Sequence, residues 1–289
     1  MKFDWRSETD ETIEHHFNPR MTLPNVMELL ADSSQRAAAA HENLTGRYDI
    51  RYGERPKECF DLFPAQSEAL GDLAPAQIFI HGGYWRMMDK SDYSHLATSV
   101  VTAGATHISL NYDLCPEVTL DDIVDEIRTA IIYIHGHAEE LGIDAERLFI
   151  AGHSAGGHLT AMMLRQDWPS FGLPTNVFKG AVPCSGVFEP EIIMHTSINE
   201  DVRLTTEMAR RNELLSRPPL CRCPVLIVAG GDEPEGFRQQ SAAYLELCRS
   251  AGLEAALEIV PGTNHFTVLD SVFGGDTPLF DRMIEMMAA

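Results

Sequence analysis

A serine stands between small residues at the end of an apolar run, where it could serve as a nucleophile. Residues 152–157 read GHSAGG and follow the apolar residues 148–151, which predict a buried strand. A strand that turns tightly into a helix around Ser154 tolerates almost no side chain two positions before and two after it, and both positions are glycine. Residues 155–165 supply the helix that must follow. The alternative is an ordinary loop or N-cap serine, but this context favours a catalytic nucleophile.

A serine hydroxyl needs a base to remove its proton, and that base needs a carboxylate to orient it. Around turns of this kind the acid and then the histidine follow the serine along the chain. We predict His265 as the base, because it directly follows the last expected strand, whereas His195 would reverse the order. We predict Asp232 as the acid, because it comes first after a buried strand and its short side chain suits a fixed hydrogen bond. Glu233 and Glu235 are close enough to be confused with it, and their alternative role is solvated loop charge.

A glycine-rich loop could stabilise the negative oxygen that forms when Ser154 attacks a carbonyl group. Residues 81–85 read HGGYW and follow the short buried strand expected at 77–80. We predict that Gly82 or Gly83 supplies one backbone N–H and Ala155 the other. Such preorganised donors commonly make the largest single contribution to stabilising the transition state. We expect His81 to hold the loop rather than to carry a proton.

Strand and helix patterns alternate through most of the chain. Strands are expected at 47–52, 58–63, 77–80, 106–110, 148–151, 177–184, 224–228 and 257–260, and helices at 91–102, 120–140, 155–165, 237–250, 266–272 and 278–287. This alternation predicts an α/β fold with a mostly parallel sheet covered on both faces. In such sheets the chemistry lies beyond the carboxyl ends of the strands, where each of the motifs falls.

We expect one large domain rather than two small ones. Residues 1–45 predict a helical N-terminal extension, and residues 46–289 the α/β domain with a cap-like insertion around 186–222. No linker, repeat or low-complexity tract separates these parts. Pairs such as His135 and His137 point to different sides of a helix, so we expect neither a metal nor another cofactor.

The charge, the apolar runs and the cysteines of the chain limit its expected partners and its expected location. A net charge of −21 repels phosphate backbones and anionic membrane surfaces, which makes nucleic acid an unexpected partner and leaves a small-molecule substrate. No run approaches the roughly 18 to 20 apolar residues that span a bilayer, and the N-terminus has no signal-like apolar region. Six cysteines in such a chain favour a reducing compartment, so we expect a cytoplasmic protein. Whether it forms a homo-oligomer is left open.

Together these motifs resemble the kynurenine formamidase (arylformamidase) branch of the α/β-hydrolases, over about residues 60–272. The resemblance rests on HGGYW at 81–85, NYD at 111–113, GHSAGGHL at 152–159, the segment 224–237 and NHF at 264–266. It implies the α/β-hydrolase fold, a formamide substrate, and Tyr84 and Trp85 as framing an aromatic leaving group. The acid loop of the family often reads Asp-x-Pro-Glu-Phe, and this chain has an extra Gly236 within it.

Three functions are therefore considered. The first is a serine hydrolase that cleaves N-formylkynurenine to kynurenine and formate through an acyl-enzyme. The second is a carboxylesterase for short acyl esters, which would use the same machinery with different pockets. The third is a catalytically silent binding protein of the same fold, which predicts a missing member of the triad.

Overall fold

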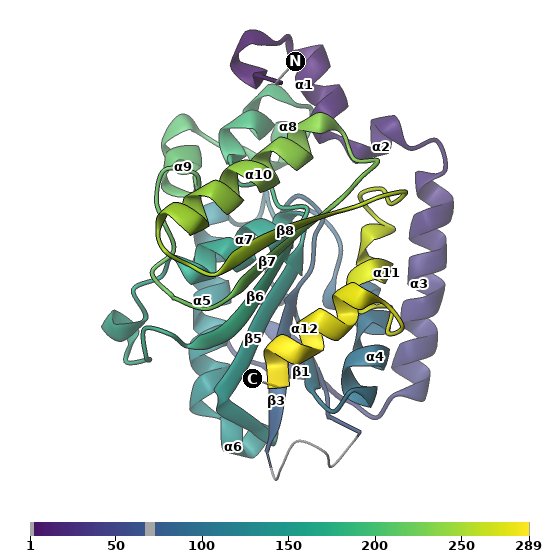
Figure 1. The fold of residues 1–289 in the computed structure, drawn as a ribbon, viewed down its shortest axis with the longest axis vertical. Coiled ribbons are helices and arrows are strands. Elements are labelled where there is room, and N and C mark those ends of the chain that lie inside the picture. Colours follow the sequence, from purple (N-terminus) through teal and green to yellow (C-terminus); the bar gives the residue numbers. More distant parts are fainter. Residues whose placement is uncertain (1–2, 67–72, 289) are drawn as a thin grey trace.

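The strands form one eight-stranded sheet in the computed structural model, which describes residues 3–66 and 73–288 (Figure 1). The strands are β1 (Arg47–Arg51), β2 (Cys59–Phe63), β3 (Ala74–Ile80), β4 (Thr106–Leu110), β5 (Ile143–His153), β6 (Phe178–Cys184), β7 (Val225–Gly230) and β8 (Ala255–Val260). Their spatial order is β1-β2-β4-β3-β5-β6-β7-β8. β2 pairs antiparallel with both β1 and β4, and the other pairs are parallel. The predicted α/β fold with a mostly parallel sheet is confirmed.

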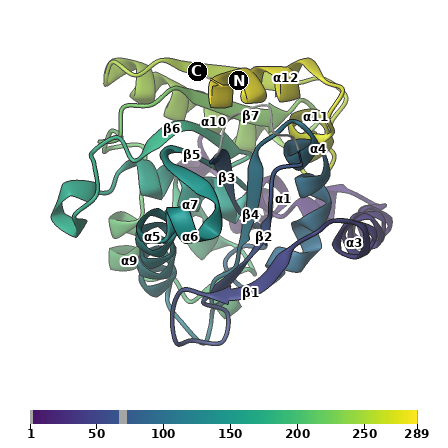
Figure 2. The same cartoon turned by 90° about the horizontal axis from the view of Figure 1, so that it is seen from below.

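Helices cover both faces of this sheet, as the continuous apolar strands require. The α-helices are α1 (Asp10–Phe17), α2 (Pro19–Thr22), α3 (Val26–Asn43), α4 (Ala97–Thr102), α5 (Leu120–Gly136), α6 (Ala138–Leu141), α7 (Ala155–Leu164), α8 (Asn199–Val202), α9 (Thr206–Arg211), α10 (Glu235–Ser250), α11 (Val268–Phe273) and α12 (Pro278–Ala288). The 3₁₀ helices are η1 (Trp5–Ser7), η3 (Lys90–Leu96), η4 (Trp168–Phe171) and η5 (Pro190–His195). Seen from below, α5, α6 and α7 lie on one side of the sheet and α4, α11 and α12 on the other (Figure 2).

Successive strand residues feed two separate apolar cores. Ile150 packs with α5, α7 and α10 on one face, whereas Ala151 packs with α11 and α12 on the other. This follows from the alternation of side chains along a strand. The six cysteines are all free and buried, as expected of small apolar residues.

The structure divides the helix expected at 91–102 into two elements. The Asp89 side chain accepts a hydrogen bond from the Ser91 backbone N–H, and the Asp92 side chain accepts one from the Asp89 backbone N–H. This capping box starts the segment as a tight 3₁₀ turn. The α-helical geometry starts only at Ala97. The helix expected at 120–140 likewise ends at Gly136.

The carboxyl ends of the parallel strands place the sequence motifs side by side. Ile80, the last residue of β3, pairs in register with Gly152 near the end of β5. The glycine-rich loop therefore begins beside the turn that carries Ser154. The loops after β6, β7 and β8 open at the same edge, which is where parallel sheets bind ligands.

Residues 3–45 include helices that lie around this edge. Figure 1 shows α1 near the top of the molecule and α3 running along one side, near α4 and α11. Arg36 of α3 pairs with Asp270 of α11 at 2.7 Å. In the described part of the chain, no helix combines the length and apolar character needed to cross a membrane.

Three fully buried histidines make the stability of this fold depend on pH. Burial lowers the pKa of His81 to about 4, of His107 to about 3 and of His158 to about 4, from 6.5. The unfolded chain therefore takes up these protons first as the pH falls. Their contribution to stability is fully present above pH 6.5 and is lost as the pH falls toward 4.

We expect one such histidine to lower the free energy of unfolding by roughly 2 kcal/mol between about pH 7 and about pH 5. Urea unfolding at the two pH values measures this loss. His107→Gln should show a smaller loss than the parent chain, whereas the exposed control His15→Gln should keep the parent's loss. Equal losses in the parent and in His107→Gln would contradict the assignment.

Candidate active site

Ser154 lies at a tight turn between β5 and α7. Its backbone has φ 56° and ψ −116°, a conformation that non-glycine residues rarely adopt and that turns the residue out of the sheet. A Cβ atom at Gly152 would lie 2.2 Å from the Gly156 carbonyl oxygen, and one at Gly156 would lie 2.0 Å from the Ile80 carbonyl oxygen. Both glycines are therefore required by close backbone approach, as the sequence motif predicts.

His265 shares one pocket with Ser154. It lies in the loop after β8, where Asn264 accepts hydrogen bonds from the backbone N–H groups of Phe266 and Thr267. The His265 imidazole packs between the rings of His153 and Phe237, with both centroids at 4.7 Å. These contacts fix the plane of the imidazole.

His153 also holds the backbone of the histidine loop. Its Nε2 lies 2.7 Å from the carbonyl oxygen of His265, and burial lowers its pKa well below the usual range. A neutral His153 is thus the donor in this hydrogen bond. Sequence reasoning treated His153 only as part of the serine motif and missed this positioning role.

Glu233, and not Asp232, faces His265. The Oε2 atom of Glu233 lies 3.5 Å from Nδ1 of His265, and the Glu233 side chain is fully buried. Its other oxygen, Oε1, accepts hydrogen bonds from Ser185 and, at 2.8 Å, from the backbone N–H of Gly230. Asp232 is exposed to solvent. The prediction of Asp232 as the acid is therefore contradicted by the geometry.

The cause of this difference is a tight turn after β7. The backbone N–H of Glu233 donates to the carbonyl oxygen of Gly230, which closes a four-residue turn with Asp232 at its outer corner. Asp232 itself donates its backbone N–H to Thr263. The chain comes back toward the sheet only at Glu233, whose additional methylene group lets the carboxylate reach the imidazole. The alternative reading of Glu233 as a solvated loop charge is also wrong, since it is buried.

The glycine-rich loop is held from beneath by His81. Its Nε2 lies 3.0 Å from the Asn111 side-chain oxygen, and its ring stacks on Tyr112 with centroids 4.2 Å apart. Burial keeps the pKa of His81 at about 4, so its imidazole is neutral near pH 7. This contact set fits the expectation that His81 holds the loop.

The three predicted oxyanion donors lie near Ser154 but are not equivalent. Gly83 lines the pocket, and Ala155 is the first residue of α7, where backbone N–H groups lack helical partners. The Gly82 N–H instead faces the buried phenol of Tyr93, where it partly offsets the rise in pKa that burial causes. The geometry therefore favours Gly83 over Gly82.

Tyr84 and Trp85, both predicted to frame the substrate, point in different directions. Tyr84 lines the pocket and donates a hydrogen bond to the carbonyl oxygen of Phe17. Trp85 is fully buried and packs edge-on against His158, with centroids 5.2 Å apart, so it does not line the pocket. Positive φ angles of 50° and 57° at the two residues turn the indole into the core. The prediction for Trp85 is therefore wrong.

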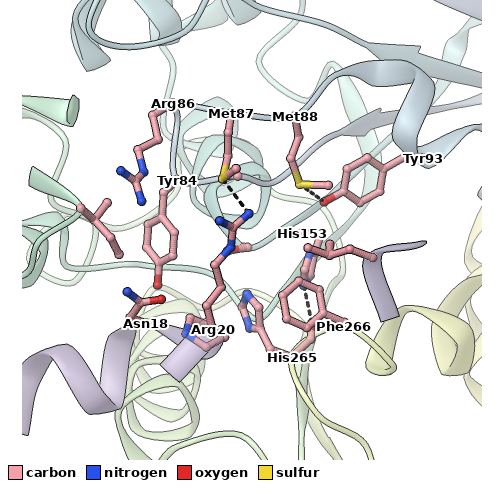
Figure 3. Close-up of a pocket in the computed structure, with 15 residues that line it drawn as sticks. Asn18, Arg20, Tyr84, Arg86, Met87, Met88, Tyr93, His153, His265 and Phe266 are labelled. Atoms are coloured by element: carbon pink, nitrogen blue, oxygen red, sulfur yellow. Dashed lines mark hydrogen bonds between the residues drawn. The ribbon is translucent and has the colours of Figure 1, made fainter. Parts of the chain in front are cut away.

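The pocket over Ser154 has a volume of about 50 Å³, and its residues come from five parts of the chain (Figure 3). It is lined by Asn18, Pro19, Arg20, Leu30, Gly83, Tyr84, Arg86, Met87, Met88, Tyr93, His153, Ser154, Ile198, His265 and Phe266. Four of these residues belong to the N-terminal helices and their connections. Sequence reasoning missed them, because no local pattern shows where an extension docks. Only Ile198 comes from the insertion at 186–222.

The N-terminal helices are anchored to the acid loop by Phe17. Its ring lies 5.3 Å from that of Phe237, and a Cβ atom at Gly236 would lie 2.4 Å from the Phe17 ring. The glycine that lengthens the acid loop therefore makes room for this phenylalanine.

Comparison with known proteins gives the family. The model of the prolyl oligopeptidase family matches residues 118–273, which is more than half of the chain. The chain belongs to the prolyl oligopeptidase family. A second family model, BD-FAE, matches residues 61–170. As a member of the prolyl oligopeptidase family, the protein is an enzyme of the α/β-hydrolase fold, which confirms the predicted fold and enzyme class.

Individual relatives agree with this placement. The kynurenine formamidase of Salmo salar is 29% identical over 98% of this chain and 98% of that protein, which confirms the resemblance found from the motifs. The carboxylic ester hydrolase LipN of Mycobacterium tuberculosis is 26% identical over 76% of this chain and 64% of that protein. A solved structure from Silicibacter sp. TM1040, provisionally assigned as a thioesterase, has a TM-score of 0.78 and 27% identity over 92% of this chain and 95% of that chain.

Proposed function

We propose that this member of the prolyl oligopeptidase family hydrolyses an N-formyl arylamine, with N-formylkynurenine as the substrate and kynurenine and formate as the products. The observation that carries this choice is the similarity to the salmon kynurenine formamidase across nearly the full length of both chains.

The proposed catalytic residues are Ser154, His265 and Glu233. Glu233 faces Nδ1 of His265, which leaves Nε2 on the opposite side of the ring to take the Ser154 proton. Ser154 Oγ then forms a bond to the formyl carbon, and the carbonyl oxygen becomes negative. We assign the backbone N–H groups of Gly83 and Ala155 to that oxygen.

Collapse of this intermediate breaks the carbon–nitrogen bond. His265 gives its proton to the leaving amine, and a formyl ester of Ser154 remains. Water then attacks this ester with His265 again as base, which releases formate and restores the serine hydroxyl. The proposed steps use only Ser154, His265, Glu233 and water.

The carboxylesterase remains the second candidate, supported by the similarity to LipN. It would use the same residues, because ester and formamide cleavage differ only in the acyl and leaving groups. The silent binding protein is disfavoured, because the nucleophile, the base and a buried carboxylate are brought together.

Turnover of N-formylkynurenine and of p-nitrophenyl acetate by the same purified protein tests the proposal. We expect the higher kcat/KM for N-formylkynurenine, measured by the absorbance of the released arylamine. Efficient ester cleavage with no detectable formamide cleavage would instead establish the esterase.

Two further proposals concern the setting of the enzyme. We propose that residues 1–45 and the insertion at 186–222 form a cover over the α/β domain of residues 46–289, supported by Arg20 and Ile198 in the pocket wall. We also propose a cytoplasmic location, supported by six free, buried cysteines.

A further inference from the structure

The charge of the pocket wall differs from that of the whole chain. The protein carries 43 acidic and 22 basic residues. Among the described residues that line the pocket over Ser154, there are two arginines and no aspartate or glutamate. An anionic group at this site would therefore meet basic side chains rather than the acidic ones that dominate the chain.

The two arginines differ in what they already bind. Arg86 forms an ion pair with the carboxylate of Asp201. Arg20 makes no salt bridge with any residue in the described part of the chain. Among residues 3–66 and 73–288, its side chain donates only to the sulfur of Met87, a weak acceptor that lies 3.3 Å from Nη2.

Arg20 is also placed to reach a bound substrate. It belongs to α2, and Pro19 of the same helix is buried beneath the site. Figure 3 shows the Arg20 side chain extending into the pocket, with its guanidinium beside Met87. A guanidinium has five N–H donors and suits a carboxylate by forming two parallel hydrogen bonds.

We propose that Arg20 binds a carboxylate on the leaving group. The enzyme would then prefer acyl arylamines whose leaving arylamine carries a carboxylate. This specificity would come from the N-terminal extension rather than from the α/β domain. The identity of the acyl group as formyl rests on the proposed function. The inferred negative charge of the leaving group rests on the position of Arg20 alone.

The test compares substrates that differ only in this charge. The free acid of desamino-N-formylkynurenine and its methyl ester share the formamide and the aromatic ring, and release of the arylamine reports cleavage of both. We expect Arg20→Gln to lower the ratio of kcat/KM for the acid to that for the ester by about 10- to 100-fold. Arg20→Lys should lose less, because it keeps the charge without the planar fork.

Arg222→Gln is the matched control, since Arg222 is exposed and outside the pocket, and it should keep the ratio of the parent enzyme. The acid should also lose kcat/KM as salt is added to the parent enzyme, more steeply than it does in Arg20→Gln. Equal changes for acid and ester in Arg20→Gln, or no change at all, would overturn the proposal.

A second substrate pair separates this inference from the proposed function. If neither formamide is cleaved, the formamidase fails, and para-acetoxybenzoate and its methyl ester then measure the same ratio for acetyl esters. A fall of that ratio in Arg20→Gln supports the carboxylate site without the formamide. An unchanged ratio refutes the site independently.

Discussion

Alanine in place of Ser154 is expected to lower kcat by about 10⁶, to the residual rate that binding and the oxyanion donors sustain without a nucleophile. The loss should be this large because each step of the proposed mechanism forms or breaks a bond to Ser154 Oγ. Steady-state turnover of N-formylkynurenine measures it. The circular dichroism spectrum should stay unchanged, since alanine keeps the Cβ atom and the backbone of the turn.

Ser170→Ala serves as its control. Ser170 is exposed in η4, and its hydroxyl donates only to the Asp167 carbonyl group among the described residues. We expect the activity of this variant to match that of the parent enzyme. Activity retained in Ser154→Ala would show that Ser154 is not the nucleophile.

Glutamine in place of Glu233 is expected to lower kcat by about 10⁴, the typical effect of removing the acid of such a triad. The amide oxygen can still accept the hydrogen bonds from Ser185 and Gly230, so the loop should keep its shape. The amide NH₂ would then face Nδ1 of His265. That nitrogen must become the acceptor, which moves the ring proton to Nε2 and prevents the imidazole from taking the serine proton.

Asp232→Asn is the matched partner of this experiment, because it makes the same change one position earlier in the chain. We expect it to alter kcat by less than about twofold, as an exposed carboxylate usually does. The pair of variants decides between the sequence-based choice of Asp232 and the geometry. A large loss in Asp232→Asn with little loss in Glu233→Gln would reverse our assignment.

The sequence was sufficient where local patterns determine the structure. Apolar runs and turn residues predicted the strands, and the glycines around Ser154 predicted the turn, because a close backbone approach leaves no alternative residue. Chain order and the position after the last strand are also visible in the sequence, and they led to His265, which lies in the same pocket as Ser154. Chain order narrowed the acid to the loop at 232–235.

The sequence was insufficient where one residue of turn geometry decides the direction of a side chain. Asp232 and Glu233 have the same chemistry, and only the hydrogen bond between Glu233 and Gly230 shows which one returns to the sheet. Trp85 was misplaced similarly, because no local pattern predicts two successive positive φ angles at bulky residues. Arg20 could not be assigned at all, since its place depends on how a distant segment docks.

The contact between Phe17 and Gly236 couples substitutions at two positions that lie far apart in the gene. A side chain at position 236 would require the Phe17 ring to move, a smaller residue at position 17, or a shift of the first helix. The helix in turn precedes the segment that brings Arg20 to the pocket. Among descendants of this enzyme, a change in the acid loop should therefore be inherited together with a change in the N-terminal helices. Substrate preference would then evolve by replacement of the pair.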